Sequence, residues 1–372
     1  MALKITIHNL LFTFKILNKK TFIKQPKSLK VLLFLNGPEG SQIGQEDGFG
    51  FLKSIGKISD LNYFYLEDFI EKNGNSSGFE KAKKIAELFQ PNLIVLFHIS
   101  KLKISHHFIM AIKNLNSKPI IAYDEGDMYG SWAKPVTSSM RKIIEYADVV
   151  SVRGLGKFGT QISKINKNLI YTPHHAELAR FDQGDEILTK RKYNLVFIGN
   201  RITSRVAWIR RLPGAKQREK FVAAICKEFG DSFMLFGNGW DKFTGNAGPV
   251  NFNDQVSIYR DTWVTLAFEH YPKIPYYFSN RLPIALMAGS LYVCHYHEGY
   301  EIIFKNCDFI FFYKNNQQAI DIIRYINSLN KSDLLERSKR ARAFAYKYFH
   351  PSSVWDNFFD NVFKIYNDNN QG

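Results

Sequence analysis

Cysteines and long apolar runs are both scarce in this chain of 372 residues. The three cysteines, Cys226, Cys294 and Cys307, match no metal-binding spacing and lie in apolar segments, as reduced core thiols do. No apolar run approaches the roughly 18 residues that a transmembrane helix requires. The sequence therefore argues against a disulfide framework and a membrane-spanning helix, and it predicts a cytoplasmic protein.

Several motifs of common enzyme and binding classes are also missing. The chain has no Walker-type phosphate loop, no GxGxxG dinucleotide fingerprint and no serine nucleophile elbow. It has no helix-turn-helix pattern, zinc-finger spacing or RNP-type motif, so a nucleic acid is not the expected partner. An Asp-x-Asp triplet is absent as well, which argues against an enzyme that binds a diphosphate through a metal ion.

Basic residues outnumber acidic ones, 50 to 34, which gives a formal net charge of +16. They are spread along the chain, and such a surface suits a phosphorylated substrate or an anionic membrane. Residues 1–30 form a basic N-terminal segment. We expect this segment to pack on the body of the protein, with an amphipathic anchor on acidic lipid as the alternative. In that alternative the protein would attach peripherally to the inner face of a membrane.

Strands alternate with helices in two successive runs. The expected strands cover 30–35, 61–66, 92–97, 119–123 and 148–152 in the first run, and 193–200, 232–239, 263–268, 291–294 and 309–312 in the second. Continuous apolar strands between helices indicate α/β sheets that are parallel and covered on both faces. The polar stretch 73–78 is interpreted as a loop. Ser332 is the expected N-cap of a helix over 333–349, and one further helix follows Pro351.

The turn-rich segment 171–192 is interpreted as a linker between two domains. The predicted organisation is a basic segment (1–30), an N-terminal Rossmann-like domain (31–180), a C-terminal Rossmann-like domain (190–350) and a final helix (351–372). Two such sheets joined by a linker place a cleft between their carboxyl edges, where α/β proteins bind ligands.

The segment 278–304 carries the clearest chemical signal. Ser279-Asn280-Arg281 leads into a short apolar helix, a strand follows, and Glu298 and Glu301 lie in an acidic turn after it. A cation at a helix N-terminus, beside carboxylates, suits a ligand that has phosphates at one end and hydroxyls at the other. This combination indicates a nucleotide-sugar site.

The second half of the chain resembles the donor domain of GT-B glycosyltransferases, in particular the spore-maturation CgeB-like group. The residues that carry the likeness are Ser279-Asn280-Arg281, 285–289 (ALMAG) and 299–304 (GYEIIF), and the likeness extends over roughly 194–366. It implies two Rossmann-like domains that face each other across a cleft, with the donor on the C-terminal domain, the acceptor on the N-terminal domain and a last helix that returns to the first domain.

The resemblance also implies an activity. Members of this family transfer a sugar from a nucleoside-diphosphate donor to a hydroxyl of a glycan or other acceptor, and they need no metal or other cofactor. The positive surface favours an anionic or lipid-linked acceptor. Many relatives carry Glu where this chain has Ile284, so the acidic contact to the donor would come from Glu298 or Glu301. Ile284 also supports a rival interpretation, a non-catalytic binding protein on the same fold.

A second resemblance concerns the identity of the donor. The segments 266–269 (LAFE) and 277–281 (YFSNR) are similar to the donor motif of α1,3-fucosyltransferases, with Asn280 in place of an acid. It implies GDP-fucose as an alternative donor on the same GT-B fold. The sequence does not specify the sugar, the base, the acceptor, the linkage or the stereochemical outcome.

Arg281 is the first candidate for donor binding, because a guanidinium pairs with a diphosphate and neutralises the leaving nucleotide. Glu301 would accept hydrogen bonds from ribose or sugar hydroxyls, unless it is a solvated residue of a first helical turn. Glycine after a strand lets backbone amides approach phosphate, although a plain turn explains it equally well. The remaining candidates for donor binding are Gly199, Asn200, Arg201, Arg205, Gly237, Asn238, Glu269, Ser279, Asn280 and Glu298.

Direct displacement at an anomeric carbon needs a base for the acceptor hydroxyl. Asp124, Glu125 and Asp127 follow an apolar strand, and neighbouring carboxylates can raise the pKa of one of them. The alternative interpretation is a solvated acidic turn. Competing candidates are Glu46, Asp47, His174 and His175. His295 and His297 share a strand face, but no third ligand is evident, so no metal site is predicted.

Overall fold

The computed structural model describes residues 29–99, 101–129, 134–176, 187–202 and 212–370. These residues form two compact units. Unit 1 contains the described residues up to Pro173, except Lys134, together with the segment that begins at Pro351. Unit 2 contains Lys134 and His174–His350. The chain therefore completes unit 2 before it returns to unit 1. Apart from its last two positions, the predicted basic segment 1–30 lies outside the described residues.

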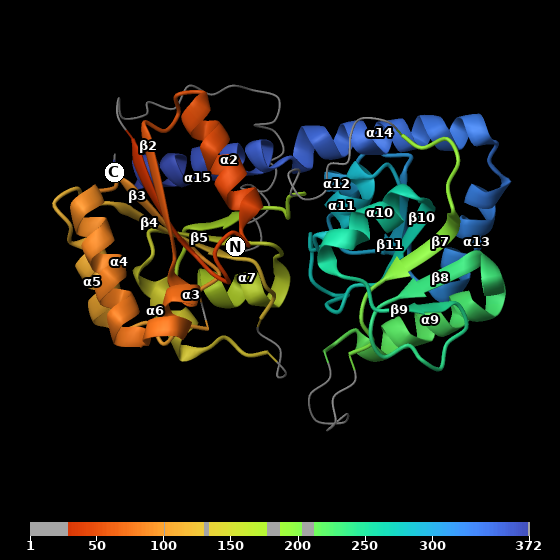
Figure 1. The fold of residues 1–372 in the computed structure, drawn as a ribbon, viewed down its shortest axis with the longest axis horizontal. Coiled ribbons are helices and arrows are strands. Elements are labelled where there is room, and N and C mark those ends of the chain that lie inside the picture. Colours follow the sequence, from red (N-terminus) through yellow and green to blue (C-terminus); the bar gives the residue numbers. More distant parts are fainter. Residues whose placement is uncertain (1–28, 100, 130–133, 177–186, 203–211, 371–372) are drawn as a thin grey trace. The chain divides into compact units, whose positions relative to one another are not determined.

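Each unit is built on a parallel β-sheet (Figure 1). The strands of unit 1 are β1 (Lys30–Leu35), β2 (Asp60–Tyr65), β3 (Leu93–Phe97), β4 (Ile120–Glu125), β5 (Val149–Val152) and β6 (Leu169–Tyr171). Those of unit 2 are β7 (Tyr193–Ile198), β8 (Phe233–Phe236), β9 (Asn246–Gly248), β10 (Thr262–Ala267), β11 (Leu291–His295) and β12 (Ile310–Tyr313). In the described residues each sheet has six strands, in the orders β2-β1-β3-β4-β5-β6 and β12-β11-β10-β7-β8-β9. The α/β fold with two Rossmann-like sheets is thus confirmed.

Helices connect the parallel strands, since a parallel pair needs a crossover. In unit 1 they are α2 (Ile43–Ser54), α3 (Leu66–Asn73), α4 (Asn75–Phe89), α5 (His106–Lys113), α6 (Ser138–Tyr146), α7 (Gly156–Ser163) and α15 (Pro351–Asn370). In unit 2 they are α9 (Ala215–Phe229), α10 (Gln255–Arg260), α11 (Arg281–Met287), α12 (Tyr300–Ile303), α13 (Asn316–Ser328) and α14 (Lys331–Phe349). Among the described helices, none combines the length and apolarity that crossing a membrane would take.

Alternate residues of the first sheet face opposite helical layers, as the two-residue period of a strand requires. Val31, Leu33 and Leu35 of β1 belong to the core to which α2 and α15 contribute. Phe34 faces the other side, where its ring centroid lies 6.1 Å from that of Phe108 in α5. Both faces of the sheet are therefore covered at β1, which explains why this strand is apolar from Val31 to Leu35.

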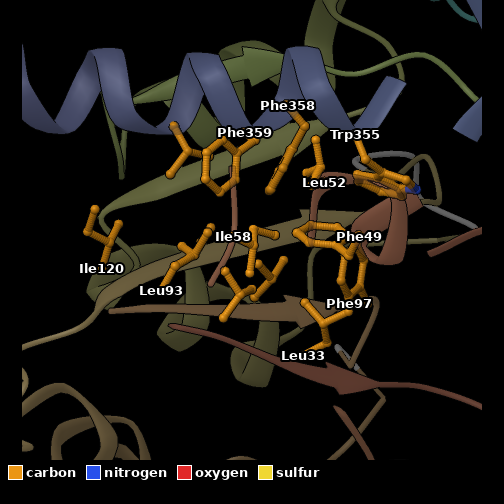
Figure 2. Close-up of a cluster of buried hydrophobic side chains, with 14 of the residues drawn as sticks. Leu33, Phe49, Leu52, Ile58, Leu93, Phe97, Ile120, Trp355, Phe358 and Phe359 are labelled. Carbon is orange, nitrogen blue, oxygen red and sulfur yellow. The ribbon is translucent and has the colours of Figure 1, made fainter. Parts of the chain in front are cut away.

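Helix α15 completes the core of unit 1 from a distant part of the sequence. Trp355 is fully buried, and its ring lies 5.5 Å from that of Phe49 in α2 and 5.1 Å from that of Phe97 at the end of β3. Its indole Nε1 donates a hydrogen bond of 3.0 Å to the carbonyl of Gly44. Figure 2 shows these rings together with Phe358 between α15 and the sheet. The indole thus joins α15 to α2 and to β3.

The prediction of a loop at 73–78 is wrong, because helices α3 and α4 occupy nearly all of this stretch. Only Gly74 separates α3 from α4, with a left-handed φ of +84° that favours glycine. Gly78 lies inside α4, where an added Cβ would sit 2.2 Å from Cγ1 of Ile70. The small residues of this stretch therefore permit close packing of two helices.

The predicted N-cap of the long helix is also wrong. Helix α14 begins at Lys331, so Ser332 lies inside its first turn. Asn330 is the N-cap, and its side-chain oxygen accepts a hydrogen bond of 2.9 Å from the backbone N–H of Asp333. Asparagine and serine are about equally good caps, so the choice depends on where the preceding loop ends.

Candidate functional site

Two glycine loops lie side by side at the carboxyl ends of β7 and β8. Gly237 has a φ of +132°, and an added Cβ would lie 2.5 Å from the carbonyl oxygen of Gly199. The backbone N–H of Gly199 donates to Phe236 O at 2.9 Å, and Trp240 Nε1 donates to the carbonyl of Gly199 at 2.6 Å. A side chain at Gly237 would push these loops apart, whereas one at Gly199 would meet the ring of Phe197 and the guanidinium of Arg281.

Two exposed asparagines extend this contact. Asn200 Oδ1 accepts a hydrogen bond of 2.9 Å from the backbone N–H of Asn238, and Asn238 O accepts one of 2.9 Å from Arg201 N–H. The Arg201 guanidinium forms an ion pair of 2.9 Å with Glu219 and lies over the ring of Phe243. Arg201 thus holds the glycine loops against their own unit, and its charge is balanced there.

Arg281 lies beside these loops at the start of α11. Its Nη2 donates to Oε2 of Glu269 at 2.7 Å, and Ser279 Oγ donates to Oε1 of the same carboxylate at 2.8 Å. The Arg281 side chain is 20% exposed, whereas that of Glu269 is 5% exposed. Nη1 of Arg281 would lie 3.3 Å from a Cβ added at Gly199. The fold therefore brings together four predicted site residues from three separate segments.

A second arginine, Arg218 of α9, enters the same cluster and was not predicted. It is 2% exposed, its Nε donates to the carbonyl of Phe268 at 2.7 Å, and its Nη1 lies 2.6 Å from Nε2 of His270. Its Nη2 is buried and has no hydrogen-bond partner in the described residues. A signal existed in the sequence, because Arg218 shares the helix face of Phe221 and Ile225.

The charges of this cluster do not cancel. Burial by itself would raise the pKa of Glu269. Arg281 and Arg218 stabilise the carboxylate, however, and together they lower its pKa to about 2. Burial lowers the pKa of Arg218 to about 9, and the nearby Arg281 adds to that effect. Two guanidinium groups therefore face one carboxylate at neutral pH, which leaves an excess of one positive charge.

Two predicted acidic ligands lie in a different environment. Glu301 is exposed, and its Oε2 accepts hydrogen bonds from Tyr296 OH at 2.8 Å and from Gly299 N–H at 3.2 Å. Glu298 is also exposed, and its carbonyl accepts a bond from Tyr276 N–H. Glu301 thus helps to begin α12. The structure does not place either carboxylate in contact with Arg281.

The other donor-site predictions divide by location. Asn280 precedes α11 as its N-cap residue and makes no side-chain capping bond. Ile284 is 1% exposed, so the position that departs from the family pattern belongs to the core of unit 2. Arg205 lies outside the described residues. In the described part of the chain, no group of three or more His, Cys, Asp or Glu residues is arranged to hold a metal ion.

Two histidines beside the arginine cluster are expected to make unit 2 acid-sensitive. Burial and Arg218 lower the pKa of His270 to about 3, while burial and His297 lower that of His295 to about 4. The unfolded chain takes up these protons from about pH 6.5 downward, but the folded protein does not. Stability is therefore fully present above pH 6.5 and falls as the pH falls towards 4, by up to about 1.4 kcal/mol per pH unit for each histidine.

Urea denaturation between pH 7 and pH 4 measures this effect. His295→Asn should have a shallower dependence on pH than the unaltered protein. His107→Gln, which removes an exposed histidine of unit 1, is the control and should leave the slope as it was. An unchanged slope in His295→Asn would contradict the prediction.

The acidic cluster of unit 1 divides into two environments. Asp124 is buried, and both of its carboxylate oxygens accept hydrogen bonds from Arg153, at 2.7 and 2.5 Å. Ser151 Oγ adds a bond of 2.6 Å. The role of Asp124 is therefore structural, because both of its oxygens bond a buried guanidinium at the end of β4. Arg153 in turn lies over the ring of Trp355, 5.7 Å from its centroid.

Glu125 and Asp127 belong to the second environment, which also contains His98. Glu125 is fully buried and accepts hydrogen bonds from Tyr123 OH and from the backbone N–H of Asp127. Its Oε1 also contacts Nδ1 of His98, the residue after β3. The sequence interpretation missed His98, although a histidine directly after an apolar strand was a usable signal.

The competing candidates for the base lie elsewhere. The carboxylate of Glu46 accepts a hydrogen bond from Tyr65 OH, and Asp47 is exposed on α2. His174 and His175 are partly buried at the first positions of the main segment of unit 2.

With this geometry in view, comparison with known proteins identifies the fold class. Residues 210–360 match the model of a family described as glycosyl transferase-like. The chain carries a glycosyltransferase domain on a GT-B fold. The matched segment of this glycosyltransferase domain includes Arg218, Glu269, Ser279 and Arg281. The narrower CgeB-like resemblance stays a prediction. No curated protein matches the sequence.

Solved structures share the whole GT-B architecture. A glycosyltransferase from Rickettsia africae ESF-5 is similar with a TM-score of 0.59 and 11% identity, over 91% of this chain and 99% of that one. Sucrose-phosphate synthase from Thermosynechococcus elongatus gives 0.55 and 11%, over 90% and 99%. HepE of Anabaena, solved with UDP and glucose, gives 0.55 and 10%, over 90% and 99%. At these identities the likeness concerns the fold.

Proposed function

We propose that this GT-B glycosyltransferase uses a nucleoside-diphosphate sugar as donor and transfers the sugar to a hydroxyl of a glycan or other acceptor. The observation that carries the proposal is that only one terminal nitrogen of the Arg281 guanidinium is hydrogen-bonded within the described residues. Its Nη2 is held by Glu269, whereas its Nη1 makes no hydrogen bond to any described residue and lies beside Gly199. A diphosphate oxygen can approach that nitrogen because glycine places no side chain there.

The surroundings of Arg281 favour a diphosphate over a neutral ligand. The pair Arg218 and Arg281 outweighs the single carboxylate Glu269, and a diphosphate would neutralise the excess as charge develops on the leaving group. Asn200 and Asn238 are exposed on the adjoining loops and offer amide donors and acceptors. Support from related proteins comes from HepE, whose structures contain UDP with glucose or UDP-glucose.

The proposal includes metal-independent transfer. In this site the charge that a metal would supply to the diphosphate comes from guanidinium groups. Nucleotide release from donor sugars is therefore expected to continue at an unchanged rate after EDTA treatment. A rate that collapses in EDTA and returns with Mg²⁺ or Mn²⁺ would contradict this part of the proposal.

A donor panel tests the function itself. Thermal-shift measurements with UDP, GDP, CMP and dTDP identify the base, and release of nucleotide from the matching sugar nucleotides identifies the sugar. We expect one nucleoside diphosphate to stabilise the protein and its sugar form to be turned over. Selective turnover of GDP-fucose would establish the fucosyltransferase alternative. Binding without turnover of any sugar would indicate a non-catalytic protein, and no binding at all would refute the donor site.

Acceptor choice is the second half of the proposal. The net charge of +16 favours an anionic glycan or a lipid-linked acceptor near an acidic membrane. Transfer to such acceptors would fall as salt screens the protein surface, whereas transfer to neutral sugars would not.

A further inference from the structure

Resting on the function proposed above, we propose that Arg218 is a positioning residue of the donor site. Its guanidinium holds the carboxyl ends of β7 and β10 at the spacing that lets a diphosphate oxygen reach Arg281 past Gly199. The residues involved all belong to unit 2. The inference therefore concerns nucleotide binding by that unit alone.

The strand ends that Arg218 joins are not joined by the sheet itself. In the described part of unit 2, the backbone ladder between β7 and β10 ends at the pair Phe197 and Leu266. The carbonyls of Asn200 and Phe268 follow that pair, and both accept hydrogen bonds from Arg218. Ligands of parallel α/β sheets bind outside the carboxyl ends of the strands. The spacing of these two ends therefore shapes the proposed donor site.

Arg218 bonds both strand ends through one rigid group. Its Nε donates to Phe268 O at 2.7 Å, and its Nη1 donates to Asn200 O at 3.2 Å. Nη1 also lies 2.6 Å from Nε2 of His270. A guanidinium is planar and only donates hydrogen bonds, so Nε2 of His270 is an acceptor here. Three acceptors in fixed directions determine the plane of the group, and the group in turn determines their separation.

The start of helix α9 brings Arg218 to this point. The backbone N–H of Gly214, the N-cap residue, donates to His270 O at 2.7 Å, and a Cβ added to Gly214 would lie 2.6 Å from Glu269 O. Arg218 follows one turn later, where its N–H donates to Gly214 O at 2.8 Å. Its side chain is buried over the ring of Phe197. The missing side chain of Gly214 thus lets α9 approach the end of β10 closely.

The residues that Arg218 bonds are chain neighbours of the proposed diphosphate contacts. Gly199 directly precedes Asn200, whose carbonyl accepts from Arg218. Glu269, which holds Arg281 at 2.7 Å, lies between Phe268 and His270. Moving either strand end would therefore move Gly199 relative to Arg281.

The burial of Arg218 favours positioning over direct contact with the donor. Its Nη2 makes no hydrogen bond within the described residues, but this nitrogen is buried, so a diphosphate cannot reach it in this structure. The side chain of Arg281 is 20% exposed and has Nη1 beside Gly199. Arg281 is thus the contact residue, and Arg218 acts through the backbone around it.

Isothermal titration of the full chain with UDP, GDP or dTDP, whichever stabilises the wild-type protein, tests the assignment. Arg218→Lys keeps the charge, but a single terminal nitrogen cannot hold three acceptors in one plane. Arg218→Met removes both the charge and the planar group. We expect both variants to bind the nucleotide about 10–100-fold more weakly, as when an outer partner that orients a ligand-binding side chain is lost. Thermal melts give the temperature at which each variant is folded, and the titrations are made below it.

Arg191 provides the matched control in the same unit. Its guanidinium also bonds backbone carbonyls, those of Thr262 at 2.5 Å and Gly289 at 3.0 Å, and it donates to Ser338 Oγ at 3.2 Å. Thr262 begins β10, at the end of the strand opposite to the donor site. Arg191→Met should therefore lower the free energy of unfolding and leave the nucleotide affinity of the folded protein unchanged.

Two results would overturn the assignment while the proposed function stands. Wild-type affinity in Arg218→Lys would show that the charge suffices without the bridging geometry. A loss of affinity in Arg218→Met no greater than that in Arg191→Met would show that Arg218 only stabilises the fold.

A milder variant decides the question if thermal melts show both Arg218 variants unfolded. His270→Ala keeps the arginine but removes one of its three acceptors. Weaker nucleotide binding in this variant supports the assignment, and unchanged binding overturns it. A wild-type protein that binds none of the nucleotides would instead overturn the proposed function together with this inference.

Discussion

Replacing Arg281 with methionine is expected to abolish nucleotide binding and to lower the free energy of unfolding by about 3–5 kcal/mol. The two effects have different causes. Binding is lost because the guanidinium is the proposed ligand of the diphosphate. Stability is lost because Glu269 is buried, and its 2.7 Å ion pair with Arg281 is the largest of the interactions that compensate its desolvation. Isothermal titration with the nucleotide and urea denaturation measure the two effects separately.

A second substitution separates a binding defect from a folding defect. The double variant Arg281→Met with Glu269→Gln removes both charges of the buried pair, so it should regain part of the lost stability, while the rest stays lost because the buried Arg218 then faces no carboxylate. It should not regain nucleotide binding. Glu269→Gln alone should keep binding, since the guanidinium remains. Recovery of nucleotide affinity in the double variant would show that Arg281 is a structural residue and would refute the proposed donor site.

An exposed ion pair of the same unit provides the matched control. Arg340 pairs with Asp308 at 2.7 Å, but the two side chains are 50% and 42% exposed. Arg340→Met should change the free energy of unfolding by less than about 1 kcal/mol and leave nucleotide affinity unaltered. The contrast between the two arginines isolates the effect of burial.

Replacing Trp355 with alanine is expected to destabilise unit 1 by about 3–5 kcal/mol, the usual cost of removing a large buried aromatic side chain. The change removes the ring contacts with Phe49 and Phe97 and leaves the carbonyl of Gly44 without its indole donor. It also uncovers the guanidinium of Arg153. Urea denaturation followed by near-ultraviolet circular dichroism measures the loss.

Two further variants test the explanation for Trp355. Gly48→Ala should also destabilise unit 1, because the new Cβ would lie 2.1 Å from Cδ1 of the indole. Leu88→Ala, at a position that is 78% exposed, should change stability by less than about 0.5 kcal/mol. If Trp355→Ala cost no more than Leu88→Ala, α15 would not be a part of the core of unit 1.

The fold was predictable because its central strands are buried on both faces. β1 and β3 read as unbroken apolar runs, and a parallel sheet between helical layers is the structure that buries such runs. The stretch 73–78 misled because Gly74 and Gly78 have different physical roles. One is a turn residue, and the other allows two helices to approach. Composition cannot separate these roles without the position of Ile70.

The site was predictable where residues that act together are also close to one another in the sequence. Ser279 and Arg281 are neighbours in sequence, and both contact Glu269. Arg218 and His98 could not be assigned in the same way, since their partners are distant in the chain. Arg218 is held by the carbonyls of Phe268 and Asn200, and His98 by Glu125. Burial of a charged group is decided by such tertiary partners, which a local pattern does not contain.

The return of the chain to unit 1 has a consequence for its biosynthesis. A ribosome makes the first sheet early, makes all of unit 2 next, and makes α15 only afterwards. Until α15 emerges, the face of the sheet that carries Val31, Leu33 and Leu35 lacks part of its cover. The nascent chain therefore exposes apolar surface, to which chaperones can bind, until α15 has been made. The core of unit 1 is completed only after unit 2 has been synthesised.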